Sequence, residues 1–380
     1  MASRQDHPTP YRPGSDRLVC ALVAHDADPG RAPLRGAGVA TLAGLLVTAI
    51  AVGAVAVWAR LAGGGDGDDW RDPHALIIEA GTGARYVWRD PLLHPVLNYT
   101  SAVLVLGDPA PATVTVPRAA LDGVPRGPVL GIPGAPESLP HADDLVTGAW
   151  TVCAPTGAPA PATVHTGELP TAPVTVHAGA TPSGGTPLDA TGLLAAGGDG
   201  AVHLLWRGHR YRLTATDPPA AWEGAPPVGL PDGLLAVLPA GGERDRDDLP
   251  PLVRPRPAAV VCAVVRDTAD APDVLLGATP PEAPAGAPRP EAATGAVWVE
   301  PGRAVLATSG TSVQLVTDLG VRHTVAPEAL ELLGYGSVRP VRLPPEVLAL
   351  VPEGPALDPV GARGHAPDGG HAKDARTGPA

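Results

Sequence analysis

An uncharged apolar run near the N-terminus constrains the fold of this chain most strongly. It extends from Gly36 to Ala59 and reads GAGVATLAGLLVTAIAVGAVAVWA. At ~1.5 Å rise per residue, a helix of this length crosses the ~30 Å hydrocarbon core of a membrane. A cleavable signal peptide has a shorter apolar stretch of ~7–15 residues and a cleavage pattern, whereas Arg60 follows this run directly. We therefore expect residues 36–60 to form one uncleaved transmembrane helix.

The arginines around this run are unevenly distributed. Arg60 and Arg71 follow it, whereas five arginines precede it, namely Arg4, Arg12, Arg17, Arg31 and Arg35. The positive-inside rule then places the N-terminus in the cytoplasm. We expect a single-pass protein of the plasma (inner) membrane, with the bulk of the chain extracytoplasmic.

Five segments follow from the composition along the chain. Residues 61–69 (LAGGGDGDD) are typical of a flexible linker. The C-terminal stretch lacks large apolar side chains and is typical of a disordered tail. The expected parts are a cytoplasmic segment 1–35, the helix 36–60, the linker 61–69, extracytoplasmic repeat and core domains 70–360, and the tail 361–380.

The extracytoplasmic part is rich in turn-forming residues. The whole chain contains 49 Pro and 47 Gly, yet 44% of its residues are hydrophobic. Because Val, Leu and Ala are spread throughout, this composition favours many short strands joined by Pro/Gly turns. The net charge of −12 argues against nucleic acid as a partner, since phosphate-binding surfaces need clustered Lys and Arg.

An internal repeat lies within this part. Residues 227–241 (PVGLPDGLLAVLPAG) and 340–354 (PVRLPPEVLALVPEG) share eight of fifteen residues in register. Each follows a strand–turn–strand stretch, at 203–213 and 313–325, and a weaker copy occupies 85–96 and 114–121 (VTVPRAAL). Each unit is predicted to be a β-hairpin followed by a short helix that its proline opens. Such a unit buries little by itself, so we expect neighbouring units to pack together.

The three cysteines divide between the two sides of the predicted helix. Cys20 lies on the cytoplasmic side and is expected to be a free thiol. Cys153 and Cys262 both lie in the exported part, where a disulfide can persist. A bridge there would close a long loop, worth ~4–5 kcal/mol in the chain-entropy model. Two buried free thiols are the alternative that their apolar neighbours also permit.

Nucleotide hydrolysis lacks its usual motif. A P-loop needs a lysine after its glycines, and the only lysine of this chain is Lys373, in the predicted tail. The linker glycines neither follow a predicted strand nor open a helix, so they do not indicate a dinucleotide site. We lean against an enzyme, and we expect no cofactor unless ATP is bound.

Other candidate side chains have simpler explanations. Ser183 and Ser309 lie in predicted turns, and no nucleophile-elbow motif occurs. His203 and His209 flank a strand-like stretch without a third ligand at a recognised spacing. Three further groups are expected to be solvated or to fill cores: the acidic linker residues Asp66, Asp68 and Asp69; the tail histidines His365 and His371; and Trp70, Trp88, Trp150, Trp206, Trp222 and Trp298. We expect no catalytic, cofactor-binding or metal site.

Several sequence blocks resemble the EccB family of type VII (ESX) secretion systems. They are LVCALVAHDADPGRAPLR at 18–35, WRDPHALIIEAGTGARYVWRDPLLHPVLNYTSAVLVLG at 70–107, GIPGAPESLP at 131–140, WTVC at 150–153, LLWRGHRYRL at 204–213 and LGYGSVRPVRLPPEVLALVPEGPALDP at 333–359. The resemblance covers nearly the whole chain except the tail. One departure is the stretch DHPTPYRPGSD near the N-terminus, whose three prolines shorten the long helix usual there in the family.

The resemblance implies a fold and a set of partners. The expected fold class is α+β and mostly β, with one transmembrane helix and an elongated periplasmic array of small repeat domains around a central β-rich core. A disulfide in that core would join Cys153 to Cys262. The implied partners are the EccC motor ATPase, EccD, EccE, a mycosin protease, further copies of this chain and membrane lipid.

The resemblance also implies a function. We expect a structural component of the type VII secretion inner-membrane complex that scaffolds the periplasmic side of the export channel. Two alternatives stay open, because members of the family are sometimes described as ATPases and because exported β-rich repeats can bind cell wall. These alternatives are a nucleotide hydrolase of the same secretion system and a cell-wall-binding module.

Overall fold

The structure is a computed structural model that forms two compact units, residues 1–69 and 70–380. The residues it describes are 22, 35–61, 69–157, 174–213, 222, 224–242, 249–256, 258–267, 269–286 and 295–364.

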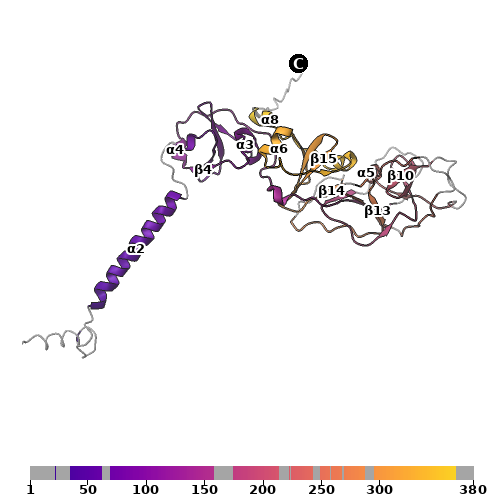
Figure 1. The fold of residues 1–380 in the computed structure, drawn as a ribbon, viewed down its shortest axis with the longest axis horizontal. Coiled ribbons are helices and arrows are strands. Elements are labelled where there is room, and N and C mark those ends of the chain that lie inside the picture. The colour runs from indigo at the N-terminus through magenta and orange to yellow at the C-terminus, as the bar shows by residue number, and fades with distance from the viewer. Residues whose placement is uncertain are drawn as a thin grey trace, which may run out of the picture. The chain divides into compact units, whose positions relative to one another are not determined.

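The first unit is described mainly by one long helix. Helix α2 (Arg35–Leu61) matches the predicted bounds to within one residue at each end (Figure 1). Leu42, Ile50 and Val55 on this helix are 62–69% exposed. In the part of the chain that the structure describes, no helix combines the length and the apolarity needed to cross a membrane. The transmembrane helix at 36–60 therefore stays a prediction.

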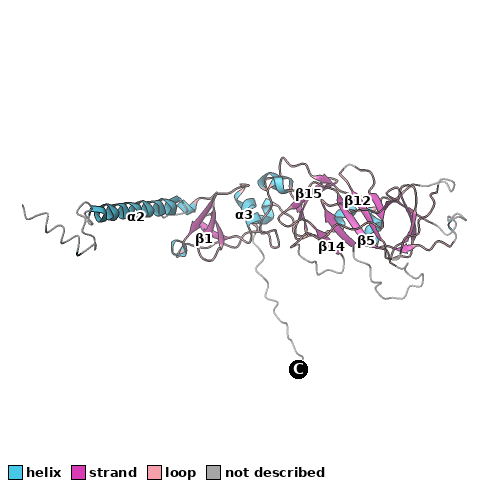
Figure 2. Ribbon diagram, turned by 90° about the horizontal axis from the view of Figure 1, so that it is seen from below, coloured by secondary structure: helices cyan, strands magenta, loops and turns pink. Residues whose placement is uncertain are grey.

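The second unit contains four β-sheets among its described residues, so the chain is mostly β (Figure 2). Three sheets have four strands and one common topology. Their first three strands form an antiparallel meander, and the fourth returns to pair with the first in parallel. We call the segments that hold these sheets the first repeat (76–130), the second repeat (193–242) and the third repeat (304–357).

The strands of the repeats are short. The first repeat contains β1 (Leu76–Glu79), β2 (Arg85–Arg89), β3 (Leu92–Pro95) and β4 (Thr113–Val116). The second contains β8 (Leu193–Ala196), β9 (Val202–Trp206), β10 (His209–Arg212) and β11 (Val228–Gly229). The third contains β15 (Ala304–Ser309), β16 (Ser312–Thr317), β17 (Arg322–Val325) and β18 (Val341–Arg342).

Two kinds of helix complete the repeats. Helices α3 (Tyr99–Leu106) and α6 (Pro327–Leu332) connect the third strand to the fourth. The shorter α4 (Arg118–Leu121), α5 (Asp232–Val237) and α7 (Pro345–Ala349) follow the fourth strand.

The predicted hairpins are confirmed, with one correction at the helices. The hairpins β2–β3, β9–β10 and β16–β17 occupy the three predicted stretches. The prolines expected in the first helical turn instead precede it, because Pro117, Pro231 and Pro344 are N-caps with extended backbone. The fixed φ of proline near −65° suits this extended conformation equally well.

The fourth strand and the short helix belong to one 14-residue segment that occurs three times without a gap. It covers 114–127, 228–241 and 341–354, and all three copies have Val, Pro, Leu, Pro and Gly at the first, fourth, eighth, twelfth and fourteenth positions. After each helix the chain pairs with the third strand of its own repeat. In the first repeat, the Leu93 N–H donates to Pro125 O and the Gly127 N–H donates to Leu93 O. Arg210 and Arg322 make the corresponding pairs in the other repeats.

The fourth sheet has six strands and corresponds to the predicted β-rich core. Its strand order is β14-β6-β5-β12-β13-β7. The bounds are β5 (Trp150–Pro155), β6 (Val174–Ala178), β7 (Thr186–Pro187), β12 (Val260–Val265), β13 (Asp273–Leu276) and β14 (Gly295–Trp298).

Two large apolar clusters join these parts. One contains Trp150 of the core sheet, Leu234 of the second repeat and Val347 of the third. The other joins the first and third repeats through Leu104 and Leu306. Helix α3 lies beside α6 and beside α8 (Pro359–Arg363), as Figure 1 also shows. Helix α8 extends into the segment 361–380 that was predicted to be a tail, and residues 365–380 lie outside the described part.

Candidate functional site

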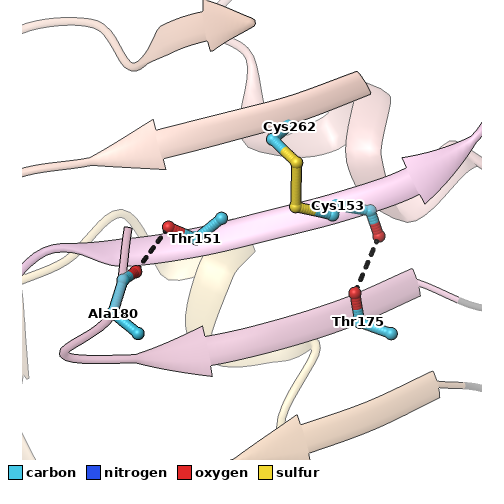
Figure 3. The surroundings of a disulfide bond; sticks show 5 residues. All are labelled: Thr151, Cys153, Thr175, Ala180 and Cys262. Carbon is cyan, nitrogen blue, oxygen red and sulfur yellow. Dashed lines mark hydrogen bonds between the residues drawn. A yellow bond between two sulfur atoms is a disulfide. The ribbon is translucent and has the colours of Figure 1, made fainter. Parts of the chain in front are cut away.

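The predicted disulfide is present in the core sheet. Cys153 on β5 and Cys262 on β12 are paired directly across two antiparallel strands, and their sulfur atoms are bonded (Figure 3). Both residues are buried, with at most 1% of their surface exposed. The Thr175 hydroxyl on β6 donates to Cys153 O at 3.4 Å, and the Thr151 hydroxyl donates to Ala180 O at 2.6 Å. The bridge is thus embedded in a hydrogen-bonded sheet.

The disulfide also encloses a whole repeat. Its two cysteines are 109 residues apart, and residues 193–242 of the second repeat lie between them. Cross-linking the ends of a loop of this length removes conformational freedom mainly from the unfolded chain. The bridge therefore holds together the two central strands from which the second repeat is inserted.

A second arrangement of polar side chains lies where the first and third repeats meet. Asn98 caps helix α3: its Oδ1 accepts from the Ser101 N–H at 2.9 Å, while its Nδ2 donates to Ile132 O at 3.0 Å. The Thr100 hydroxyl donates to Pro136 O at 2.6 Å, and the Ser101 hydroxyl accepts from the Ile132 N–H at 2.9 Å. These buried side chains attach the segment 131–140 to the first repeat.

The third repeat binds the same segment. The Tyr335 hydroxyl donates to Pro140 O at 2.7 Å, and burial raises the pKa of this hydroxyl above its ordinary value. We call the buried set Asn98, Thr100, Ser101 and Tyr335, with segment 131–140, the repeat junction. Three of the blocks that carry the family resemblance, at 70–107, 131–140 and 333–359, meet there.

Two histidines occupy equivalent places beside this junction. His94 on β3 and His323 on β17 each contact the backbone carbonyl of a proline through Nδ1, Pro128 at 3.0 Å and Pro355 at 2.9 Å. Burial lowers the pKa of His323, and its hydrogen bond to Pro355 opposes that shift. Because their partners are carbonyl oxygens, both Nδ1 atoms are hydrogen-bond donors.

A further buried histidine belongs to the core sheet. His177 on β6 is 4% exposed and pairs in register with Thr151 on β5 and Trp298 on β14. Burial lowers its pKa from 6.5 to about 4. This imidazole is therefore neutral at physiological pH.

The side chains considered as catalysts or ligands are not brought together. His203 on β9 lies opposite Arg212, whereas His209 on β10 lies opposite Trp206 and bonds to Arg207 O at 2.8 Å through Nδ1. Across the described ranges, no three His, Cys, Asp or Glu residues are grouped as metal ligands. The other candidates do not converge either: Ser183 forms a backbone bridge with Thr279, Ser309 ends β15 at a hairpin, and Asp66, Asp68, His365, His371 and Lys373 lie outside the described residues.

The tryptophans mostly fill cores. Those at 70, 150, 206 and 222 are at most 6% exposed, and those at 88 and 298 are partly buried. Trp206 Nε1 donates to Asp189 O at 2.7 Å and Trp222 Nε1 donates to Pro250 O at 3.2 Å. They agree with the expected structural role.

One cavity has charged walls. It measures about 460 Å³ and lies between the second repeat, the β12–β13 loop and the start of α7. Its charged lining residues are Arg210, Arg266, Asp270 and Glu346, and Arg266 forms an ion pair with Asp273. Two carboxylates beside the arginines disfavour a polyphosphate there.

Comparison with known proteins decides the family. Residues 2–245 and 247–366 match the family described as "Type VII secretion system ESX-1, transport TM domain B", EccB. The chain belongs to the EccB family. The blocks noted in the sequence therefore belong to an EccB protein, and three of them, at 70–107, 131–140 and 333–359, contribute to the repeat junction.

Several curated EccB proteins are similar over part of the chain. The ESX-3 secretion system ATPase EccB3 of Mycobacterium tuberculosis H37Rv is 35% identical over 144 residues, which cover 38% of this chain and 26% of that protein. The ESX-5 secretion system ATPase EccB5 of Mycobacterium marinum is 32% identical over 208 residues, covering 51% and 36%. The matched part thus spans about a quarter to a third of these relatives.

Solved EccB structures share the fold. The EccB3 dimer from the ESX-3 core complex has a TM-score of 0.55 at 22% identity, covering 76% of this chain and 100% of that one. A chain of the intact ESX-5 inner membrane complex has a TM-score of 0.55 at 19% identity, covering 94% of both chains. The mostly β fold of several small sheets is therefore that of EccB.

The residues of the repeat junction were not singled out from the sequence. Asn98, Thr100 and Tyr335 belong to no motif with a recognised chemistry, and their partners are backbone carbonyls that any sequence carries. A signal did exist for the histidines, because VPRGP at 124–128 and VPEGP at 351–355 nearly repeat.

Proposed function

We propose that this EccB protein is a structural component of the type VII secretion inner-membrane complex and scaffolds the periplasmic side of the export channel. The observation that carries the proposal is that sequence blocks typical of the family form the contacts between repeats. Asn98, Thr100 and Tyr335 bond to backbone groups at the repeat junction, where they hold repeats together. A scaffold requires such fixed contacts between its domains.

Helix α2 is proposed to be the membrane anchor, with the N-terminus in the cytoplasm. The uncharged run 36–59, its helical conformation and the excess of arginines before it support this topology. Cys20 offers a direct test, since the other two cysteines are bonded to each other. A membrane-impermeant maleimide should label Cys20 only after the cells are permeabilised. Labelling in intact cells would show that the N-terminus lies outside the cytoplasm, which contradicts the proposed topology.

The proposed protein partners are the EccC motor ATPase, EccD, EccE, a mycosin protease and further copies of this chain. Solved relatives come from an ESX-5 inner membrane complex and an EccB3 dimer, which supports assembly of this kind. Membrane lipid is also a proposed partner, because it would surround the single membrane anchor.

A nucleotide hydrolase is the alternative that the relatives' names raise, since several are called ATPases. The only lysine, Lys373, follows no glycine-rich loop. Arg210 and Arg266 share their cavity with Asp270 and Glu346, whose negative charges oppose phosphate binding. We therefore favour the scaffold over a hydrolase, and also over a cell-wall-binding module, because the family's own description is a transport component.

The deciding experiment is purification of the full chain from its native membrane in mild detergent. EccC, EccD and EccE should co-purify, and ATPase activity should disappear when EccC is removed. ATP turnover by the purified full chain alone would overturn the scaffold proposal in favour of the hydrolase. A matched preparation of the Cys153→Ala/Cys262→Ala variant tests whether the intact core is needed for assembly.

A further inference from the structure

The second and third repeats carry an arginine at the same place on their third strand. These residues are Arg210 on β10 and Arg322 on β17. Each donates its backbone N–H to the carbonyl of the proline at the twelfth position of the 14-residue segment, and each accepts from the N–H of the glycine at the fourteenth. The surroundings of the two side chains can therefore be compared position by position.

The Arg322 guanidinium is fully engaged. Its Nε donates to Val351 O at 2.9 Å, and its Nη2 donates to the Glu353 carboxylate at 2.7 Å. Its Nη1 donates to Gln314 Oε1 at 3.2 Å. Each of its three nitrogen atoms thus has an acceptor.

Arg210 lacks the equivalent acceptors. Ala240 occupies the thirteenth position of the segment, which is Glu353 in the third repeat. His203 corresponds to Gln314, and its buried Nδ1 has no hydrogen-bond partner among the described residues. Within the part of the chain that the structure describes, the half-buried Arg210 guanidinium forms no hydrogen bond or ion pair. A carboxylate is the acceptor that suits a guanidinium best.

The missing carboxylate coincides with a cavity. The cavity of about 460 Å³ described above is lined by Arg210, Leu238 and Ala240. Leu238 and Ala240 correspond to Val351 and Glu353, which supply two of the acceptors in the third repeat. The cavity therefore borders the position at which the third repeat holds a carboxylate.

The other walls of the cavity are acidic and apolar. Asp270 of the β12–β13 loop and Glu346 of α7 line it, and neither forms an ion pair within the described ranges. Arg266 also lines it, but its charge is offset by the ion pair with Asp273. The apolar lining includes Val237, Leu238, Val265, Pro272 and Pro344. A few polar groups on apolar walls are typical of a small-molecule site.

We propose that this cavity binds a small zwitterion of the amino-acid or short-peptide class, with its carboxylate on Arg210 and its ammonium group facing Asp270 and Glu346. The internal precedent for the carboxylate is the Arg322–Glu353 pair at the same position of the fold. An anion without an ammonium group would meet two uncompensated carboxylates. This inference goes beyond the proposed scaffold and depends on neither its membrane anchor nor its partners.

The residues that follow Ala240 are internal competitors for Arg210. The stretch 243–248 reads ERDRDD and lies outside the described residues. A variant in which its four acids are replaced by amides should bind the ligand as tightly as the unmodified chain. Tighter binding would show that this stretch supplies the carboxylate, and would overturn the inference.

The test is ligand-observed NMR on the full chain in detergent micelles, with the dipeptide Ala-Leu as the probe. Its acetylated form keeps only the carboxylate, and its C-terminal amide keeps only the ammonium group. Ala-Leu should bind at least about tenfold more tightly than either capped form, because it alone satisfies both signs of charge. Free leucine and Ala-Ala-Leu extend the series to a shorter and a longer zwitterion.

Variants of the arginine test the carboxylate end. Arg210→Gln should weaken the binding of Ala-Leu at least about tenfold. Arg212→Gln is the matched control, because Arg212 is exposed on the same strand and does not line the cavity. Ala240→Glu supplies the carboxylate that the third repeat has at Glu353, so it should occupy Arg210 and abolish binding.

Variants of the acids test the ammonium end. Asp270→Asn/Glu346→Gln should remove the preference for Ala-Leu over its acetylated form. Asp273→Asn is unsuitable as a control, since it would release Arg266. Glu353→Gln is suitable, because Glu353 belongs to the equivalent site of the third repeat, and it should leave the preference intact.

Three further results would overturn the inference: no binding of leucine, Ala-Leu or Ala-Ala-Leu, equal affinities for Ala-Leu and both capped forms, or equal losses from Arg210→Gln and Arg212→Gln. The first two are measured on the unmodified chain, so they hold even where a variant folds poorly. Co-purification with EccC, EccD and EccE is measured separately. Its failure would count against the scaffold, whereas failure of ligand binding defeats only this inference.

Discussion

A side chain on Gly127 would overlap the imidazole ring of His94, the ring whose Nδ1 bonds to Pro128 O. The same relationship joins Gly354 to His323, where an added Cβ would lie 2.5 Å from Cε1. In the second repeat a Cβ on Gly241 would overlap Tyr211. None of these glycines has a positive φ, so the backbone conformation does not require glycine. Glycine is required because a side chain at each position would collide with the neighbouring ring. The invariant glycine of the 14-residue segment thus makes room for a ring from the third strand.

Gly241 and Gly242 allow a matched test of this packing. We expect Gly241→Ala to lower the free energy of unfolding by about 1–3 kcal/mol, because the new methyl group displaces the Tyr211 ring. Gly242 has no atom within 4 Å of an added Cβ, so Gly242→Ala should be neutral or stabilise by up to about 1 kcal/mol. Urea unfolding followed by tyrosine and tryptophan fluorescence measures both. Equal effects of the two substitutions would contradict the assigned role of the glycine.

The disulfide should contribute strongly to stability. We expect Cys153→Ala/Cys262→Ala to lose about 4–5 kcal/mol, since the unfolded chain gains the freedom of a loop of 109 residues. The difference between the denaturation midpoints of the oxidised, unmodified protein and of the double variant measures this loss. Reduction of the unmodified protein should reproduce most of it.

Cys20→Ala is the control for that pair, because it removes the thiol that is not bridged. Its midpoint should match that of the unmodified protein. If the double variant unfolded at the same denaturant concentration as the control, the disulfide would contribute nothing to the stability of the protein.

The sequence predicted the hairpins and the short helices because both carry local signals. In the hairpin at 203–213, a turn that contains a glycine separates the two strand-like stretches. A proline precedes each short helix and marks where it begins. The first strand of each repeat was missed. ALII at 75–78 and LLAA at 193–196 are continuous apolar runs without an alternating pattern, and such runs do not distinguish a buried strand from a helix.

Contacts between distant segments could not be predicted in the same way. The pairing of Cys153 with Cys262 depends on the register of β5 and β12, which the spacing of 109 residues does not encode. The Tyr335–Pro140 bond joins residues 195 positions apart, and its acceptor is a backbone carbonyl. The shared exported location of the two cysteines and the family resemblance both indicated the disulfide, whereas the repeat junction could be found only in the structure.

The core sheet should lose stability in mild acid because of His177. Its pKa is lowered to about 4 by burial, whereas an unfolded chain binds the proton near pH 6.5. The folded state therefore disfavours protonation of His177. The contribution of this neutral histidine to the free energy of unfolding is fully present above pH 6.5 and is lost as the pH falls toward 4. Over that window the loss attributable to His177 is about 3 kcal/mol.

Unfolding midpoints between pH 7.5 and 4 measure this loss. His177→Gln should flatten the decline, while His74→Gln, which changes an exposed side chain, should leave it unchanged. His323 contributes in the same direction, because burial also lowers its pKa. A decline as steep in His177→Gln as in the unmodified protein would assign the acid sensitivity to other groups.

The Tyr335 hydroxyl should hold the third repeat to segment 131–140. Tyr335→Phe removes the 2.7 Å bond to Pro140 O and leaves that carbonyl without this partner, a loss of about 1 kcal/mol. Hydrogen exchange should become faster at the Ala135 and Leu145 amides, which bond within and just beyond the segment, to Ile132 O and Ala142 O. Exchange in β9 of the second repeat should not change. A uniform acceleration that includes β9 would mean global destabilisation. No acceleration at either amide would show that the Tyr335 bond is not needed to hold the segment, and that the bonds of Asn98, Thr100 and Ser101 together with apolar packing suffice.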